Sequence, residues 1–201
     1  MSTNRLEAFS DAVLAILITI MVLELRAPEG EHFDSLRAVV PGLLVYVLSF
    51  AYLGIYWNNH HHMLHVTERA TGPILWANLY LLFWLSLIPF ATGWMSEHHL
   101  AAAPTALYGT VLLMAAIAYT ILSQLIIASQ GADSVLRRAV GNDWKGWASI
   151  VLYASAIAIA FASHWVAQGI FVLVALLWLV PDRRIERVLA AAAVTAEPRA
   201  Q

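Results

Sequence analysis

The amino-acid sequence predicts an all-α membrane protein that crosses the bilayer six times within one domain. Of its 201 residues, 61% are hydrophobic and only 12% are charged, about half the charged share of a typical soluble domain. Basic residues gather in the connectors on one side of the apolar stretches, as in polytopic membrane proteins. These stretches, each typical of a membrane span, lie at residues about 6–25, 38–57, 74–94, 105–128, 147–162 and 165–180.

The first span, 6–25, carries an acidic residue, Asp11, in its first half. An ionisable side chain at that depth is costly and usually has a partner, so Asp11 belongs either to a functional site or to a structural polar network. With about 100° between successive helical residues, Asp11 lies about 140° and Ser10 about 120° from Ile16. A largely apolar stripe around Ile16 contains Phe9, Ala12, Val13, Ile16, Thr19, Ile20 and Leu23. If the Ser10 and Asp11 face is buried, this stripe is free to line a pore, or it faces lipid or another helix.

The second and third spans carry prolines with different consequences. Pro41 lies in the first turn of the span 38–57, where a missing N–H does no harm. That span ends in aromatic residues typical of a headgroup interface. Pro89 lies inside the span 74–94 and should kink it or end its regular part. The same span carries Asn78, whose amide we expect to make a packing hydrogen bond with another helix.

The last three spans complete the single domain. A short loop with His98 and His99 leads into the span 105–128, and the longest polar connector follows it. The spans 147–162 and 165–180 are joined by a tight turn, and the sequence after them stops the last helix with a proline and charged residues. We therefore expect one transmembrane domain over residues 1–182 and a cytoplasmic tail over 183–201.

The distribution of basic residues predicts the orientation. Six spans put both termini on one side, and nine of the eleven Lys and Arg residues lie on that side: Arg5, Arg69, Arg137, Arg138, Lys145, Arg183, Arg184, Arg187 and Arg199. Only Arg26 and Arg37 lie on the other side. By the positive-inside rule we expect both termini to be cytoplasmic. No basic run with interleaved aromatic residues indicates a nucleic-acid partner, so the lipid bilayer is the expected surrounding.

Eight histidines and no cysteine raise the question of a metal centre. His61 and His65 are four residues apart and share a helical face, a spacing suited to zinc or iron. The predicted topology, however, places His60–His65 and His98–His99 about a bilayer apart, which forbids a joint site. The sequence carries no P-loop, Rossmann fingerprint, nucleophile elbow or HExxH helix. We expect no enzyme activity, cofactor or bound metal; a histidine-cluster metalloenzyme and a non-conducting scaffold or transporter are the alternatives.

Short motifs in the first half resemble a known channel family. The pattern Arg5-x-x-x-Phe9-Ser10-Asp11 opens the first span, and Tyr56-Trp57 with His60-His61, Trp76-x-Asn78 and Pro89-Phe90 follow. Together they resemble the prokaryotic relatives of transmembrane protein 175, the endosomal and lysosomal potassium channel family. The second half resembles this family only in hydropathy and length.

The resemblance implies a homotetramer of six-helix subunits whose first helices surround a central pathway for potassium ions. It implies constriction by apolar side chains, with Ile16 narrowest and Ile20 and Leu23 next, in place of a TVGYG carbonyl filter. It also assigns Thr19 to a pore-side hydroxyl position implicated in potassium preference. The implied anchor of the first helix is a polar network of Arg5, Ser10, Asp11, His60 or His61, Trp76 and Asn78.

Overall fold

The computed structural model describes residues 3–131, 134–141 and 143–179, all of them helical or in loops. The predicted tail, 183–201, lies outside the described residues. The all-α prediction is confirmed over the described part. The helices are α1 (Thr3–Leu23), the 3-10 helix η1 (Phe33–Ala38), α2 (Val40–His65), α3 (Gly72–Ser86), α4 (Ile88–Glu97), α5 (Ala102–Gln130), α6 (Val135–Val140), α7 (Trp144–Ala160) and α8 (His164–Leu179).

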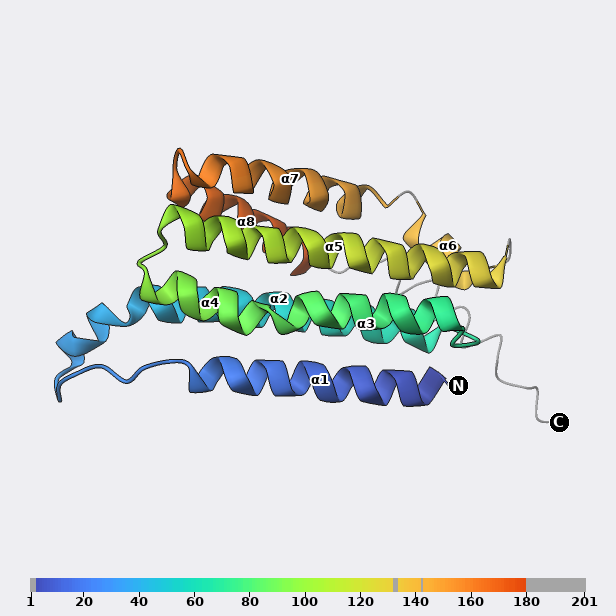
Figure 1. Ribbon diagram of the computed structural model, residues 1–201, viewed down its shortest axis with the longest axis horizontal. Helices are drawn as coiled ribbons and strands as arrows, with labels where there is room; N and C mark the ends of the chain where they lie inside the picture. The colour runs from blue at the N-terminus through green and yellow to red at the C-terminus, as the bar shows by residue number, and fades with distance from the viewer. Residues whose placement is uncertain (1–2, 132–133, 142, 180–201) are drawn as a thin grey trace.

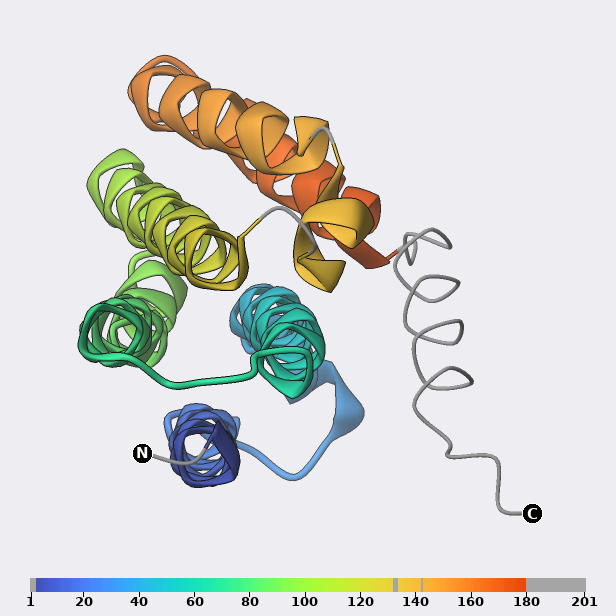
Figure 2. The same ribbon diagram turned by 90° about the vertical axis from the view of Figure 1, so that its right-hand side faces the viewer.

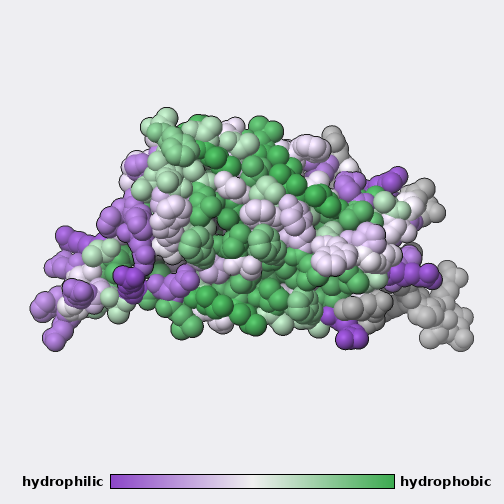
Figure 3. All heavy atoms as spheres, viewed as in Figure 1, coloured by the Kyte–Doolittle hydropathy of each residue, from purple (hydrophilic) through white to green (hydrophobic). Residues whose placement is uncertain are grey.

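The apolar helices make this a multi-pass membrane protein. Four stretches are long and apolar enough to cross a bilayer: α1, α2, the α3 and α4 pair, and α5. The helices α7 and α8 are apolar but shorter, at 17 and 16 residues. Figure 3 shows hydrophobic residues over the middle of one face and hydrophilic residues towards both ends. That distribution matches an apolar belt in lipid between two aqueous surfaces.

The long helices run side by side along the longest axis of the molecule (Figure 1). Seen end-on, α1 lies at the edge of the bundle, while α7 and α8 lie on the opposite side (Figure 2). The helix α1 packs against α2, α3 and α4, and α5 packs against α3, α4, α7 and α8. The position of α1 leaves one of its faces without cover from the rest of the chain.

Two helices differ from the predicted spans at points that matter for the site. The region of the third span is two helices that meet at Leu87, because Pro89 has no N–H and its ring excludes the carbonyl four residues earlier. The second helix continues past the predicted limit at residue 57 to His65. It therefore carries the histidine cluster in helical register, and the rings of His61 and His65 stack with centroids 6.2 Å apart.

Buried aromatic residues hold the second half of the bundle together. Tyr108 of α5 and Phe171 of α8 meet edge to face with ring centroids 5.4 Å apart. A Cβ at Gly109 would lie 2.9 Å from the Phe171 ring, so glycine permits this close approach. Tyr52 of α2 donates a 2.6 Å hydrogen bond to the carbonyl of Phe171. This core gives α2 a fixed support against which α1 packs.

Candidate functional site

The helix α1 has one buried face and one exposed face. The buried residues recur every three or four positions and are Leu6, Ser10, Leu14, Leu17 and Met21. On the opposite face Ile16, Ile20 and Leu23 are 55%, 40% and 81% exposed. When the rest of the chain leaves an apolar helical face uncovered, that face must lie against lipid, a partner protein or a dewetted passage. The exposed stripe is thus the first part of the candidate site.

Thr19 lies within the exposed stripe, and its hydroxyl has a defined orientation. Its Oγ1 donates a 2.8 Å hydrogen bond to the carbonyl of Ile16. Because the proton is used in that bond, the oxygen lone pairs are the part of the group available to other partners. An oxygen that can only accept is suited to a cation.

A chain of buried polar groups fixes the other face of α1. Ser10 donates a 2.9 Å hydrogen bond to the carbonyl of Leu6, and Asn78 Nδ2 donates a 3.0 Å bond to Ser10 Oγ. Asn78 Oδ1 then accepts a 2.7 Å bond from His60 Nε2. Ser10 and Asn78 are 0% exposed and His60 is 1% exposed. The chain joins α1, α3 and α2 through groups that would be costly to leave unpaired.

Two acidic residues of α1 face α2 beside this chain of bonds. Trp57 Nε1 donates a 3.0 Å hydrogen bond to Asp11 Oδ1. His61 Nδ1 lies 2.8 Å from Glu7 Oε1, an ion-pair separation, although the two atoms are not aligned as a hydrogen bond. The Trp57 and His61 rings stack with centroids 6.0 Å apart. Among the described residues, Asp11 thus hydrogen-bonds to an indole and makes no such bond with Arg5 or a histidine.

The structure brings together part of the set expected to anchor α1. Ser10, His60 and Asn78 form one hydrogen-bonded chain, and Asp11 and His61 lie next to it. Trp76 is 75% exposed and Arg5 is exposed as well. Neither side chain makes a hydrogen bond or ion pair with another residue in the described part of the chain. Both lie on the surface of the single subunit.

Glu7 and Trp57 are the contacts that the sequence analysis did not assign to this site. Glu7 precedes Asp11 by four residues, and Trp57 precedes His61 by four. Residues four apart share a helical face, so each pair forms a patch. Two complementary patches, one on each of two consecutive helices, were the signal that could have identified this contact.

A second polar region lies where α1 ends, at the opposite end of the bundle. Glu24 and Glu97 line a hollow of about 610 Å³ together with residues at the start of α2. Arg26 forms an ion pair with Glu97. Partial burial and, to a lesser extent, the negative charge of Glu97 raise the pKa of Glu24. Glu24 therefore loses its charge at a higher pH than an ordinary glutamate.

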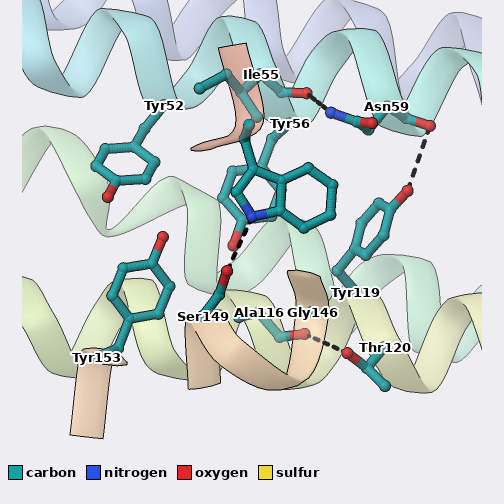
Figure 4. A pocket seen from close by; sticks show the side chains of 11 residues that line it. Tyr52, Ile55, Tyr56, Asn59, Ala116, Tyr119, Thr120, Gly146, Ser149 and Tyr153 are labelled. Carbon is teal, nitrogen blue, oxygen red and sulfur yellow. Dashed lines mark hydrogen bonds between the residues drawn. The ribbon is translucent and has the colours of Figure 1, made fainter. Parts of the chain in front are cut away.

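A pocket on the far side of α2 is too small to be the site. Tyr52, Tyr153 and Trp178 are among its lining residues, and its volume is about 40 Å³, enough for water-sized groups. Several of its polar groups already bond within the chain; Trp178 Nε1, for example, donates to Ser149 Oγ at 2.9 Å (Figure 4). The candidate site is therefore α1 with its α2 and α3 contacts.

The chain is similar to a family of channels. Residues 5–89 match the sequence model of a family described as endosomal/lysosomal potassium channel TMEM175. A protein named potassium channel from Chryseobacterium sp. (strain P1-3) is 53% identical over 94% of this chain and 98% of its own length. A protein named endosomal/lysosomal proton channel TMEM175 from Danio rerio is 26% identical over 65% of this chain and 25% of its own length.

A solved structure supports the same likeness in three dimensions. The structure is described as the crystal structure of a lysosomal potassium-selective channel TMEM175 homolog from Chamaesiphon minutus. It superposes with a TM-score of 0.76 and 27% sequence identity, over 89% of this chain and 96% of that chain. The family and these relatives are channels and not enzymes. The histidine-cluster metalloenzyme is therefore not supported.

Proposed function

The chain belongs to the TMEM175 channel family, and from this we propose that it forms a potassium-permeable cation channel with a hydrophobic constriction on α1 and no TVGYG filter. Membership of the family makes it an ion channel. Potassium is the proposed permeant ion because the Chryseobacterium relative, which matches almost the whole chain, is named a potassium channel. The expected setting is a bacterial plasma membrane, with both termini in the cytoplasm.

The proposed assembly is a homotetramer of six-span subunits. Residues 1–182 would form the transmembrane domain, and 183–201 a cytoplasmic tail. One apolar stripe cannot enclose a pore, whereas four copies related by rotation can. The observation that carries the proposal is the exposure of Ile16, Ile20 and Leu23 on a helix whose opposite face is buried. The position of α1 at the edge of the bundle supports a place beside a central axis (Figure 2).

The proposed constriction conducts by a change in width. Rings of Ile16, Ile20 and Leu23 would exclude water and ions when narrow, and a widening of about an ångström or two would admit hydrated or partly hydrated ions through a dewetting gate. Isoleucine and leucine side chains offer no oxygen to replace the hydration shell of an ion. Selectivity would therefore rest on Thr19. Its hydroxyl proton is already bonded to the carbonyl of Ile16, so its oxygen can coordinate a cation.

The polar contacts behind α1 are proposed to act as its anchor. The hydrogen-bonded chain through Ser10, Asn78 and His60 holds one azimuth of α1 against α2 and α3. Asp11 adds its contact with Trp57. Since a one-residue slip of register turns a helix by about 100°, loss of these bonds would misplace the stripe. Arg5 and Trp76, exposed in one subunit, would complete the network across subunit contacts.

Ion flux out of vesicles tests the proposal. Purified protein in liposomes loaded with potassium is diluted into potassium-free buffer, and potassium efflux is followed after a proton ionophore is added to balance the charge that leaves. We expect potassium flux well above that of empty vesicles, with less sodium flux under the same gradient. A proton gradient imposed alone provides a third measurement, in view of the proton-channel name of the vertebrate relative. Absence of any ion flux from folded protein would favour a non-conducting scaffold.

A further inference from the structure

We propose that Glu7, Asp11 and His61 form a binding site for a transition-metal ion of the Zn²⁺ class, which links α1 to α2. One ligand atom from each of the three side chains lies within 4.8 Å of the others. The three residues come from two helices that pack against each other, so the backbone already holds the group together. A bound metal would require these atoms to lie somewhat closer together, and rotation of the side chains can bring them closer.

The types of ligand favour zinc over calcium or magnesium. Zinc binds both imidazole nitrogen and carboxylate oxygen, and zinc sites with three protein ligands keep a water in the fourth position. Calcium and magnesium prefer oxygen ligands alone. Because the set includes the nitrogen of His61, borderline metals are preferred over the hard cations.

An independent observation concerns the imidazoles. His61 Nδ1 is a buried atom that points toward the Glu7 carboxylate without an aligned hydrogen bond. His60 Nδ1, on a neighbouring ring that is 1% exposed, also has no hydrogen-bond partner among the residues described. The His60 side chain lies close enough to Asp11 and Glu7 to interact electrostatically with their carboxyl groups. A buried polar atom without a hydrogen-bond partner calls for an explanation such as a bound water or ion, and a metal held by Glu7 and Asp11 would give His61 Nδ1 a partner.

The surroundings would orient the ligands. Trp57 Nε1 holds Oδ1 of Asp11, which leaves the second oxygen of that carboxylate for a metal. The His61 ring is stacked between Trp57 and His65, with centroid separations of 6.0 Å and 6.2 Å. Such outer contacts restrict ligand motion and typically change metal affinity by about 10- to 100-fold when removed.

Metal binding by the purified full-length chain tests the site without any need for conduction. Zn²⁺ is titrated by calorimetry in detergent, with Mg²⁺ as a hard-cation comparison. We expect one Zn²⁺ per chain with a dissociation constant in the micromolar range or below, and no Mg²⁺ binding in that range. His61→Gln, Glu7→Gln and Asp11→Asn should each weaken Zn²⁺ binding by more than about tenfold, since each removes a direct ligand. Asp11→Asn keeps a side-chain oxygen that can accept the hydrogen bond from Trp57. His99→Gln, at the other end of the bundle, is the matched control.

The same titration separates this site from the simpler alternative. If His65→Gln weakens binding as much as His61→Gln while Glu7→Gln and Asp11→Asn leave it unchanged, the metal binds the exposed histidine pair and the proposal is wrong. Absence of Zn²⁺ binding to wild-type protein also overturns it. Protein that conducts potassium but binds no Zn²⁺ contradicts the metal site alone. Protein that binds Zn²⁺ as expected but carries no ion flux contradicts the proposed function alone.

Discussion

Asn78 of α3 donates a 3.0 Å hydrogen bond from its side-chain nitrogen to the hydroxyl of Ser10, at the fully buried position of α1. This contact sets the azimuth of the helix. Ile16 lies about 120° around the helix from Ser10 and is 55% exposed. The bond that holds Ser10 inside thus also fixes which residues of α1 lie outside.

Replacement of Asn78 by alanine should destabilise the protein. The change leaves His60 Nε2 without its acceptor and Ser10 Oγ without its donor in a buried setting. An unsatisfied buried polar group costs about 1–3 kcal/mol. We expect a lower melting temperature in detergent for Asn78→Ala, measured by intrinsic fluorescence. Asn58→Ala, on the exposed side of α2, is the matched control, and equal melting temperatures for the two variants would contradict the anchor.

Replacement of Ile16 by asparagine should increase ion conductance. A polar side chain in the proposed constriction would hold water and lower the barrier to ion passage. A reduction of about 1.4 kcal/mol corresponds to a tenfold rise in rate. Single-channel current in planar bilayers measures the effect, and selectivity should fall at the same time. Val22→Asn is the control, because Val22 is 47% exposed but lies about 120° from Ile16. Unchanged conductance in Ile16→Asn would remove Ile16 from the constriction.

Replacement of Thr19 by valine should reduce the preference for potassium over sodium. Valine keeps the branched shape but lacks the oxygen that we propose for the cation. Thr19→Ser keeps that oxygen and should retain most of the preference. Reversal potentials under bi-ionic conditions give the permeability ratio for each variant. A ratio that is equal in Thr19→Val and wild type would show that selectivity arises elsewhere.

Acidification on the side where α1 ends should lower potassium conductance at low ionic strength. The pKa of Glu24 is raised by partial burial and by the charge of Glu97. As pH falls, Glu24 therefore becomes neutral before an ordinary glutamate does, and each chain loses one negative charge where α1 ends, at one end of the proposed pore. We expect Glu24→Gln to show the lower conductance already at neutral pH, with a weaker pH dependence. Glu29→Gln, in the exposed connector, is the control. A Glu24→Gln profile identical to wild type would exclude Glu24 as the titrating group.

The division of α1 into two faces could be predicted from the sequence, because helical periodicity alone determines which residues share an azimuth. The burial of Ser10 and Asn78 was likewise predictable from the cost of an unpaired polar group in a membrane helix. The partner of Asp11 was not, since it depends on which part of α2 packs beside α1. The sequence predicts Trp57 among the interfacial aromatic residues, and the structure adds its hydrogen bond to Asp11.

The end of α2 was also difficult to predict. The polar residues from Asn58 to His65 follow the predicted span 38–57 and indicate the edge of the membrane. No proline or glycine lies in that run, so nothing in its backbone chemistry ends the helix, and α2 continues to His65. Hydropathy locates where a segment leaves lipid, whereas helix termination depends on local backbone preferences. The histidines gained a helical register, and with it the contact of His61 with Glu7.

Thiol accessibility along α1 tests the central claim most directly. The chain contains no cysteine, so Ile16→Cys, Ile20→Cys and Val22→Cys each introduce one reactive thiol per chain. We predict that a water-soluble, charged thiol reagent blocks potassium current in Ile16→Cys and Ile20→Cys and leaves Val22→Cys unaffected. Current that persists in the first two variants after mass spectrometry shows full modification, or block that is confined to Val22→Cys, would place the isoleucine stripe away from the pore and contradict the account.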